Sequence, residues 1–430
     1  MIIDFTVSNF RSIKEPQTIS FEATDDKHLE DYYVVEKGGY RLLKMATIMG
    51  ANASGKTNLL RAYTAFPILA TLACENKTDK IPYNRFALGE STSNEDSTMT
   101  ANFLCGNRKY RYSVVFNNDM VVSEDLDCIP FGEKEEHKVF QRTTDKTSLV
   151  SYIKYGEKYA EDEPELQKLV TNLLHNRTVF GAYLKSNVNI RWMKEIVDWV
   201  VSYCMPIITP SQQNLKSFTS NQIFLNQITK EQVAAFLRKA DIGIVDFSIK
   251  NEDIPVSQQV AALLLNEQTT PAGVKEQLRS TSTITDTKIK MYHSGVKGNV
   301  ELDFNEESLG TQRYYELAGI LLALTNGSHI IAIDELESSI HPDLYEHFIV
   351  SFLSNAKDSQ LIYTTHMREF LSDKNLFRDD SIWFAQKDEH GATEVYSITD
   401  FDSEELQKID SRYGAYRAGR LGGVPHLGDT

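Results

Sequence analysis

The pattern of apolar and polar residues divides the chain into β-rich, helical and mixed stretches. Apolar and polar residues alternate over residues 1–21, which predicts two strands around a turn at 9–17. Similar patterns predict strands at 99–104, 110–116, 120–126 and 138–142, and a short extended segment at 81–87. We therefore expect an antiparallel β lobe in the first part of the chain.

Helical periodicity begins at about residue 151. Apolar residues recur at three- and four-residue spacing in three stretches, 165–174, 192–203 and 230–239. Pro206, Pro210 and the polar run 211–220 interrupt this pattern, and no heptad repeat is sustained. Strand patterns return at 244–250, 288–293 and 300–304. Between them, the polar stretch 255–282 is interpreted as a mobile excursion.

Short apolar runs predict buried strands of a second sheet. They lie at 45–49, 329–333 and 360–364, with closing strands at 381–386 and 394–399. Together, these patterns predict an α/β protein with a mixed sheet and flanking helices. We expect three parts, which are an N-terminal lobe at 1–150, a mainly helical insertion at 151–285 and a C-terminal lobe at 286–430.

Composition narrows the choice of partners and compartment. The 430 residues include 45 Lys and Arg against 60 Asp and Glu, which gives a net charge of −15. This charge opposes nonspecific binding of nucleic acid over the whole surface, although it leaves a local basic groove open. The four cysteines have no metal-binding spacing, and the chain shows neither a signal peptide pattern nor a membrane span. We expect a cytoplasmic protein with reduced thiols and no membrane partner.

A phosphate-binding motif follows the first apolar strand pattern. Residues 50–57 read GANASGKT, which matches G-x-x-x-x-G-K-[ST]. Gly50 and Gly55 let the backbone approach phosphate oxygens, and the loop N–H groups form an anion cradle before the next helix. Lys56 is expected to contact the β- and γ-phosphates, and Thr57 offers a hydroxyl to Mg²⁺. The residues expected around the nucleotide are Gly50, Asn52, Ala53, Ser54, Gly55, Lys56, Thr57 and Asn58.

An acidic pair ends the strand pattern at 329–333. Asp334 is expected to complete the Mg²⁺ shell with Thr57, and Glu335 to orient or deprotonate the attacking water. On its own, an acidic pair at the end of a strand is common and does not indicate a functional site. Together with the phosphate-binding motif, it predicts a site that hydrolyses ATP with Mg²⁺, where Lys56 and Glu335 are catalytic.

Four further residues have both an ordinary and a functional interpretation. Ser308 lies where a helix N-cap belongs, and Gly310 leaves the backbone uncovered before the helix. His366 follows the strand pattern 360–364 and is either a packed strand-end histidine or a site residue. Arg11 is either a surface arginine or a contact to the nucleotide.

The order of the motifs resembles a known family. The segments SNFRS, GANASGKT, ESLGTQR, IIAIDELESSIHP and IYTTH resemble the ABC-type ATPase heads of SMC proteins, RecF and OLD-family nucleases. More narrowly, the chain resembles AAA-family ATP-binding proteins of RloA/AbiL type, including the ATPase subunit of the PARIS defence system. The C-terminal stretches RDDSIWFAQKDEHGATEVYSITDF and YRAGRLGGVPHL are similar to that group too. The resemblance is weakest over residues 151–285 and implies an ABC-type P-loop ATPase head with a helical insertion.

The resemblance also implies roles for matching residues. Residues 50–57 would be Walker A, and Asp334 with Glu335 would be Walker B with its catalytic carboxylate. His366 would be the catalytic switch histidine, and Arg11 would approach the nucleotide from the N-terminal turn.

A second group of residues would act on the neighbouring subunit. Ser308, Gly310 and Thr311 would form a signature that caps the γ-phosphate held by the partner, and 338–341 would be the D-loop region. The signature departs from the commoner L-S-G-G-Q, since it reads Ser-Leu-Gly-Thr-Gln. The usual Q-loop glutamine is missing, and Asn84 is the candidate to replace it.

The family resemblance favours an ATP-dependent switch. It implies a homodimer or a larger homo-oligomer held together by ATP and released by hydrolysis. The stretch after His366 is too short for the TOPRIM nuclease of OLD-family proteins, so we expect a separate, nuclease-type effector in anti-phage defence. DNA or a phage component remains a possible partner.

Two alternatives belong to other classes. A DNA-repair ATPase that clamps duplex DNA, like RecF, would need a local basic groove, and the net acidity argues mildly against it. An energising subunit of a membrane transporter is less favoured, because the usual signature and Q-loop are absent.

Overall fold

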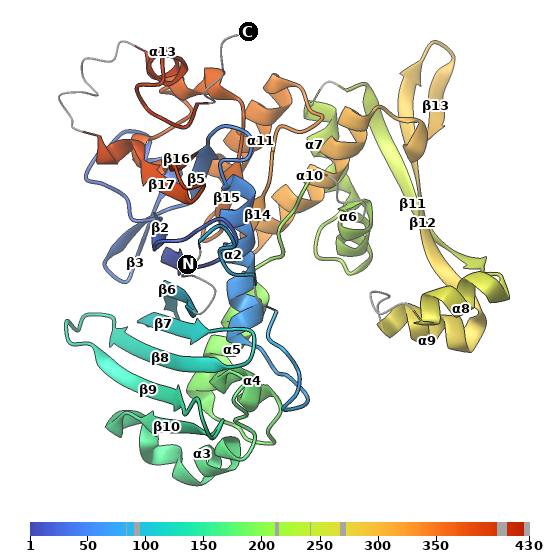
Figure 1. Cartoon of the computed structure of the whole chain (residues 1–430). Helices are drawn as coiled ribbons and strands as arrows, with labels where there is room; N and C mark the ends of the chain where they lie inside the picture. The colour runs from blue at the N-terminus through green and yellow to red at the C-terminus, as the bar shows by residue number, and fades with distance from the viewer. Residues whose placement is uncertain are drawn as a thin grey trace. The chain divides into compact units, whose positions relative to one another are not determined.

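A computed structural model describes residues 1–82, 84–89, 95–210, 215–240, 242–266, 272–401 and 411–424 (Figure 1). The chain divides into two compact units. The first consists of Met1–Ser211, Leu324–Ser338 and Ile349–Thr430, and the second of Gln212–Ala323 and Ser339–Phe348. Helices α10 (Leu309–Asn326) and α11 (Pro342–Asn355) each begin in the second unit and end in the first.

A five-stranded sheet forms the centre of the first unit. Its order is β14 (Ile330–Ile333), β15 (Gln360–Thr364), β5 (Met45–Met49), β16 (Ile382–Lys387) and β17 (Thr393–Ser397). The first four strands are parallel, and β17 is antiparallel to β16. Every residue of β5, β14 and β15 is buried, which explains why these strands are continuous apolar runs. The parallel register brings their carboxyl ends to one edge of the sheet.

A seven-stranded antiparallel sheet forms the other layer of the first unit. Its order is β10 (Ser151–Tyr155), β9 (His137–Thr144), β8 (Val121–Pro130), β7 (Arg108–Phe116), β6 (Ser97–Cys105), β1 (Ile2–Ser8) and β2 (Gln17–Ser20). The predicted β lobe is therefore present, and each strand is longer than its pattern suggested or shifted by a few residues. A separate pair joins β3 (Val34–Lys37) to β4 (Tyr40–Leu43).

Helix α2 (Lys56–Ala70) connects the two layers of the first unit. It packs against β14 and β15 on one side and against α4 (Val179–Leu184) and α5 (Arg191–Tyr203) on another (Figure 1). Tyr63 and Phe66 from α2 contact the ring of Phe5 from β1 edge-on, with ring centroids 5.7 Å apart in both pairs. The other helices of this unit are α1 (Glu30–Tyr33), α3 (Glu163–Val170) and α13 (Arg412–Arg417).

The second unit combines helices with a three-stranded antiparallel sheet. Its elements are α6 (Leu215–Phe224), α7 (Lys230–Lys239), β11 (Ile244–Pro255), α8 (Gln258–Asn266), α9 (Ala272–Thr281), β12 (Thr283–Gly295) and β13 (Gly298–Asp303). The sheet order is β11-β12-β13.

The described residues of 255–282, which we interpreted as a mobile excursion, form regular structure. They continue β11 and form α8 and α9, which contact each other, and α9 contacts β12. Leu278 on α9 is 3% exposed. The few apolar positions of this stretch suffice to pack two short helices, although polar residues dominate its composition. The extended segment expected at 81–87 has no strand among its described residues.

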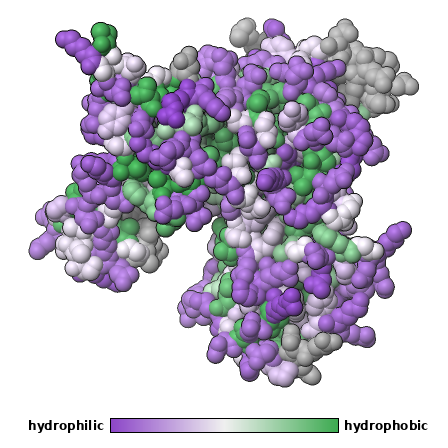
Figure 2. Space-filling view, turned by 180° about the vertical axis from the view of Figure 1, so that it is seen from behind, coloured by the Kyte–Doolittle hydropathy of each residue, from purple (hydrophilic) through white to green (hydrophobic). Residues whose placement is uncertain are grey.

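The predicted α/β class, with a mixed sheet, flanking helices and an antiparallel β lobe, is confirmed. The face of the molecule in Figure 2 is mainly hydrophilic, with apolar residues in separate groups. None of the helices in the described part of the chain has the length and apolar character needed to cross a membrane.

Candidate functional site

The phosphate-binding motif forms a loop between β5 and α2. Gly55 has φ 106° and Ala53 has φ 63°, so both lie in the left-handed region. A Cβ at Gly50 would overlap the carbonyl oxygen of Ala385, and one at Gly55 would overlap the side chain of Thr393. The two glycines are therefore required by close packing against β16 and β17 as well as by the turn itself.

Lys56 is held inside this loop. Its Nζ donates to the carbonyl oxygens of Gly50 at 2.8 Å and Ala51 at 2.9 Å. Burial lowers the pKa of Lys56, while Asp334, Glu335 and Glu337 act in the opposite direction. The ammonium group therefore lies within the loop, where a positive charge suits an anion such as a phosphate.

The structure brings Thr57 and Asp334 together, although they lie far apart in the sequence. The hydroxyl of Thr57 donates to Asp334 Oδ2 at 2.8 Å. The other carboxylate oxygen, Oδ1, accepts from the hydroxyl of Thr364 at 2.7 Å. Asp334 is 6% exposed, so its carboxylate is oriented by two hydroxyl groups at the carboxyl edge of the sheet. A hydroxyl and a carboxylate side by side are oxygen ligands of the kind that Mg²⁺ prefers.

Glu335 adopts an unusual backbone conformation next to this pair. Its φ is 49°, in the left-handed region, and its N–H donates to the hydroxyl of Thr364 at 2.8 Å. Strained backbone of this kind persists where the surroundings hold it, and it is frequent at functional sites. Thr364 therefore fixes both acidic residues, which no sequence motif indicated.

His366 lies on the same edge. Its Nε2 is 3.9 Å from Glu335 Oε1, and its backbone N–H donates to Glu337 Oε1 at 2.6 Å. Burial, followed by the positive charge of Lys56, lowers the pKa of His366, while the three neighbouring acids oppose this shift. The lowered pKa favours the neutral imidazole, in which one nitrogen donates and the other accepts. The structure places His366 beside Glu335, as expected for a site residue. Its catalytic role stays a prediction.

A network of side-chain hydrogen bonds holds the phosphate-binding loop against the N-terminal turn and β17. Ser12 Oγ accepts from Asn58 Nδ2 at 2.9 Å and lies 2.8 Å from Thr393 Oγ1. Thr393 Oγ1 in turn donates to the carbonyl oxygen of Ser54 at 3.0 Å. The N-terminal turn and β17 thereby hold the phosphate-binding loop. Asn58, expected to surround the nucleotide, takes part in this network instead of lining either pocket beside the loop.

Two pockets flank the loop. The first, of about 310 Å³, is lined by Gly50, Ala51, Asn52, Thr365, His366, Arg368 and Tyr416, with Met49 at its base. The second, of about 500 Å³, is lined by 51–54, Gln386, Lys387 and the C-terminal residues Gly419, Gly422, Gly423 and Val424. Arg368 and Tyr416 thus join the site although the sequence analysis did not select them. The Ser54 hydroxyl is buried and has no hydrogen-bond partner within the described residues.

Arg11 lies elsewhere in the same unit. It lines a pocket along α2 together with Arg61 and Asn84, and neither pocket beside the phosphate-binding loop includes it. The backbone N–H of Arg11 donates to the carbonyl oxygen of Asn84 at 2.6 Å. It stays a prediction that Arg11 contacts the nucleotide. It also stays a prediction that Asn84 takes the place of the Q-loop glutamine.

The candidate signature belongs to the second unit. Ser308 Oγ accepts from the backbone N–H of Thr311 at 3.1 Å, so Ser308 caps α10 as expected. A Cβ at Gly310 would come within 2.8 Å of the carbonyl oxygen of Ser339, so glycine is needed for close packing. Gln312 Nε2 donates to the carbonyl oxygen of Glu307 at 2.9 Å. The signature residues therefore form a rigid helix start next to Ser339 of the candidate D-loop region.

Comparison with known proteins gives one family match. Residues 206–372 match a family model described as "AAA domain, putative AbiEii toxin, Type IV TA system", which covers less than half of the chain. No curated protein matches.

Solved structures that are similar share little sequence with the chain. A crystal structure of an Smc head bound to the C-winged helix domain of ScpA has 12% identity and a TM-score of 0.42, and covers 94% of this chain and 99% of that one. The SMC head domain from Thermotoga maritima has 12% identity and a TM-score of 0.39, with 92% and 98% covered. The recombination mediator protein RecF has 13% identity and a TM-score of 0.36, with 92% and 98% covered. The family match places Asp334, Glu335 and His366 within an AAA domain segment.

Proposed function

We propose that this protein is a Mg²⁺-dependent ATPase that works as an ATP-controlled switch. The observation that carries this proposal is the hydrogen bond of 2.8 Å between Thr57 and Asp334, because it joins the phosphate-binding loop to the acidic strand end. Strand β15 lies between β14, which Asp334 follows, and β5, which precedes the phosphate-binding loop, and its Thr364 orients Asp334. The AAA domain match over 206–372 supports the same reading.

The residues suit phosphoryl transfer to water. The loop N–H groups and Lys56 would bind the β- and γ-phosphates, and Arg368 adds a cation to the neighbouring pocket. Thr57 and Asp334 would hold Mg²⁺, and the metal would supply positive charge to offset that of the phosphates. Glu335, whose backbone is fixed by Thr364, would take the proton of the attacking water. His366, which lines a pocket together with Gly50, Ala51 and Asn52, would help to position that water or the γ-phosphate.

The direct test measures phosphate release by the purified chain with ATP. We expect hydrolysis in the presence of Mg²⁺ and its loss when EDTA removes the metal, with recovery on addition of excess Mg²⁺. Each Mg²⁺-bound ATP should give one phosphate and one ADP. Hydrolysis at the same rate in EDTA would contradict the role of Thr57 and Asp334 as metal ligands.

We further propose that two copies share each site. One copy would supply the phosphate-binding loop, Asp334 and Glu335, and its neighbour would supply the helix start at Ser308, Gly310 and Thr311. The N–H groups at the start of α10 are suited to contact a γ-phosphate. ATP would then hold two copies together, and hydrolysis would release them.

Ser308→Arg is expected to leave ATP binding intact and to abolish hydrolysis. The larger, charged side chain would obstruct the helix start, which belongs to the second unit, whereas Lys56 and the phosphate-binding loop belong to the first unit and are unchanged. Mixing it with a Lys56→Ala protein should restore activity, since a mixed dimer contains one site with an intact loop and an intact signature.

The mixing experiment needs proof that mixed dimers form, for example by tagging the two variants differently. If tagged mixed dimers hydrolyse ATP no faster than either variant alone, the shared site is ruled out. An unchanged rate in Ser308→Arg itself would rule out its role at the γ-phosphate. Neither result would contradict ATP hydrolysis by the chain.

The switch would control a separate effector in anti-phage defence. Support comes from the motif resemblance to the RloA/AbiL and PARIS group, and from the words "putative AbiEii toxin, Type IV TA system" in the matching family description. A nuclease-type partner is the effector that this resemblance implies. Expression of the chain with neighbouring genes during phage infection tests this part independently of the hydrolysis assay.

A further inference from the structure

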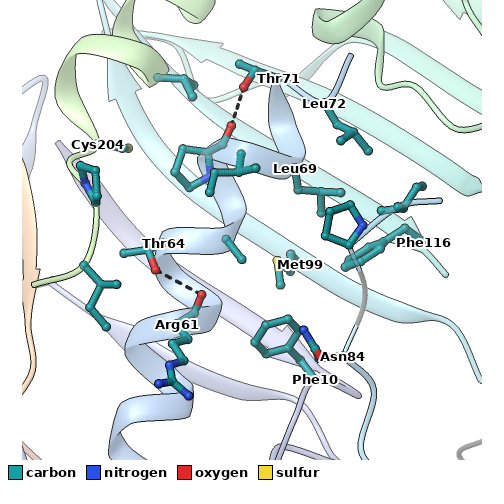
Figure 3. A pocket seen from close by; sticks show the side chains of 18 of the residues that line it. Phe10, Arg61, Thr64, Leu69, Thr71, Leu72, Asn84, Met99, Phe116 and Cys204 are labelled. Carbon is teal, nitrogen blue, oxygen red and sulfur yellow. Dashed lines mark hydrogen bonds between the residues drawn. The ribbon is translucent and has the colours of Figure 1, made fainter. Parts of the chain in front are cut away.

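A third pocket in the described part of the first unit is distinct from the phosphate-binding loop. It has a volume of about 490 Å³ and follows one face of α2 (Figure 3). The helix contributes Arg61, Thr64, Ala65 and Ile68, whose spacing is that of one helical face about 10 Å long. Cys204 lies on one side of this face, and Phe10, Asn84, Met99 and Phe116 lie on the other (Figure 3).

Most of the residues that line this groove are apolar, both at its floor and at its rim. Phe10, Leu69, Met99 and Phe116 are buried at its floor. At the rim, Ile68 and Val201 are each 65% exposed. An occupant that covered these side chains would gain roughly 25 cal/mol for each Å² of apolar surface removed from water. A protein surface can cover the rim of a groove as well as its floor, whereas a small molecule covers only the floor. The exposed apolar rim therefore favours a protein as the occupant of this groove.

One end of the groove is positively charged. Arg11 and Arg61 both line it, and no Asp or Glu is among its described lining residues. Burial, and then the charge of Arg61, lower the pKa of Arg11. The Arg11 Nε is buried and has no hydrogen-bond partner in the described chain, and its guanidinium lies 5.7 Å from the ring centroid of Phe10. Two neighbouring cations without a carboxylate favour an anionic group on the occupant.

Arg11 is held at this end by its backbone. Its φ of 53° is in the left-handed region, and its N–H donates to Asn84 at 2.6 Å. This turn fixes the backbone from which the Arg11 side chain enters the groove. A contact that is fixed in advance loses less conformational entropy on binding.

We propose that this groove is the docking site for an amphipathic helix of a partner protein. The apolar side chains of that helix, spaced i, i+3, i+4 and i+7, would lie along α2, and an acidic residue at one end would pair with Arg61 and Arg11. This inference rests on the proposed function in one respect, since the partner would be the separate effector. Because α2 begins at the phosphate-binding loop, the same helix would contact both the partner and the nucleotide site.

The test uses fluorescein-labelled amphipathic peptides of about twelve residues. Leu, Ile, Phe or Trp is varied at the four apolar positions, and the end residue is either Glu or Lys. We expect the best Glu peptides to bind the wild-type chain at least about tenfold more tightly than their Lys counterparts. Ile68→Asp should abolish binding, and Arg61→Glu should reverse the preference so that the Lys peptides bind more tightly.

Two matched variants control for nonspecific effects. Arg191→Glu changes another exposed arginine of the same unit, and Val170→Asp changes another exposed apolar residue at the end of α3. Both should bind peptide like the wild type. ATP hydrolysis is measured for every variant, and we expect Ile68→Asp to retain it, which separates this inference from the proposed ATPase.

Three results would overturn the inference. The first is that no library member prefers the wild type over Ile68→Asp. The second is that Arg61→Glu keeps the preference for Glu peptides. The third is that decanoate, an apolar chain with one carboxylate, binds as tightly as the best peptide, which would assign the groove to a small amphipathic anion.

Discussion

Lys56→Ala is expected to abolish measurable ATP binding. The Lys56 ammonium bonds to the carbonyl oxygens of Gly50 and Ala51 and is the cation inside the loop. Hydrogen bonds to charged groups contribute about 1.5–3 kcal/mol each, so losing the contacts to two phosphates should weaken binding by about 100-fold or more. Isothermal titration calorimetry with ATP and Mg²⁺ measures this loss directly.

Lys80→Ala is a suitable control, because Lys80 is an exposed lysine that pairs with Asp119. It should bind ATP like the wild type. Thermal unfolding of both variants shows whether the loop variant still folds, since Lys56 also closes the loop through its own carbonyl oxygens. Near-wild-type affinity in a folded Lys56→Ala protein would contradict the assignment of the phosphate-binding loop.

Local sequence patterns were sufficient to predict much of this architecture. The bounds of β5 and β15 agree with the predicted 45–49 and 360–364, because fully buried parallel strands are continuous apolar runs bounded by polar residues. Helix α7 at Lys230–Lys239 also agrees with its predicted range, since its apolar positions repeat at helical spacing. The loop between β5 and α2 was predictable because its glycines, lysine and threonine have the spacing of a phosphate-binding motif.

These local patterns could not predict contacts between segments that are distant in the sequence. Thr364 lies within an apolar strand, and nothing local shows that its hydroxyl will orient Asp334 and the N–H of Glu335. Ser12 and Thr393 support the loop from opposite ends of the chain. A single serine or threonine in a strand or turn has no distinctive spacing, so only the fold reveals its partners.

The C-terminal segment illustrates the same limit. Tyr416 stacks on Phe384 at 5.5 Å between ring centroids and lines the pocket beside His366. Its hydroxyl donates to the carbonyl oxygen of Gly423, which lies next to Gly50. The sequence showed only arginines among glycine and alanine in this region. Its position beside the phosphate-binding loop depends on where β16 and β17 place it.

Glu335→Gln is expected to bind ATP and Mg²⁺ but to hydrolyse ATP about 10²–10⁴-fold more slowly, which is the usual contribution of one general base. Asp334 keeps its bonds to Thr57 and Thr364, so metal binding should survive. The glutamine side chain cannot take a proton from water at neutral pH. Single-turnover phosphate release, measured with saturating enzyme, isolates this chemical step from product release.

The slow variant should also accumulate the ATP-bound assembly. If ATP joins two copies and hydrolysis separates them, light scattering should show an ATP-dependent increase in mass that lasts longer in Glu335→Gln than in the wild type. Glu337→Gln is the matched control, because Glu337 is an acid of the same edge that accepts the His366 N–H. It should keep most of the hydrolysis rate. Unchanged turnover in Glu335→Gln would show that another residue activates the water, and the mechanism proposed for this edge of the sheet would have to be withdrawn.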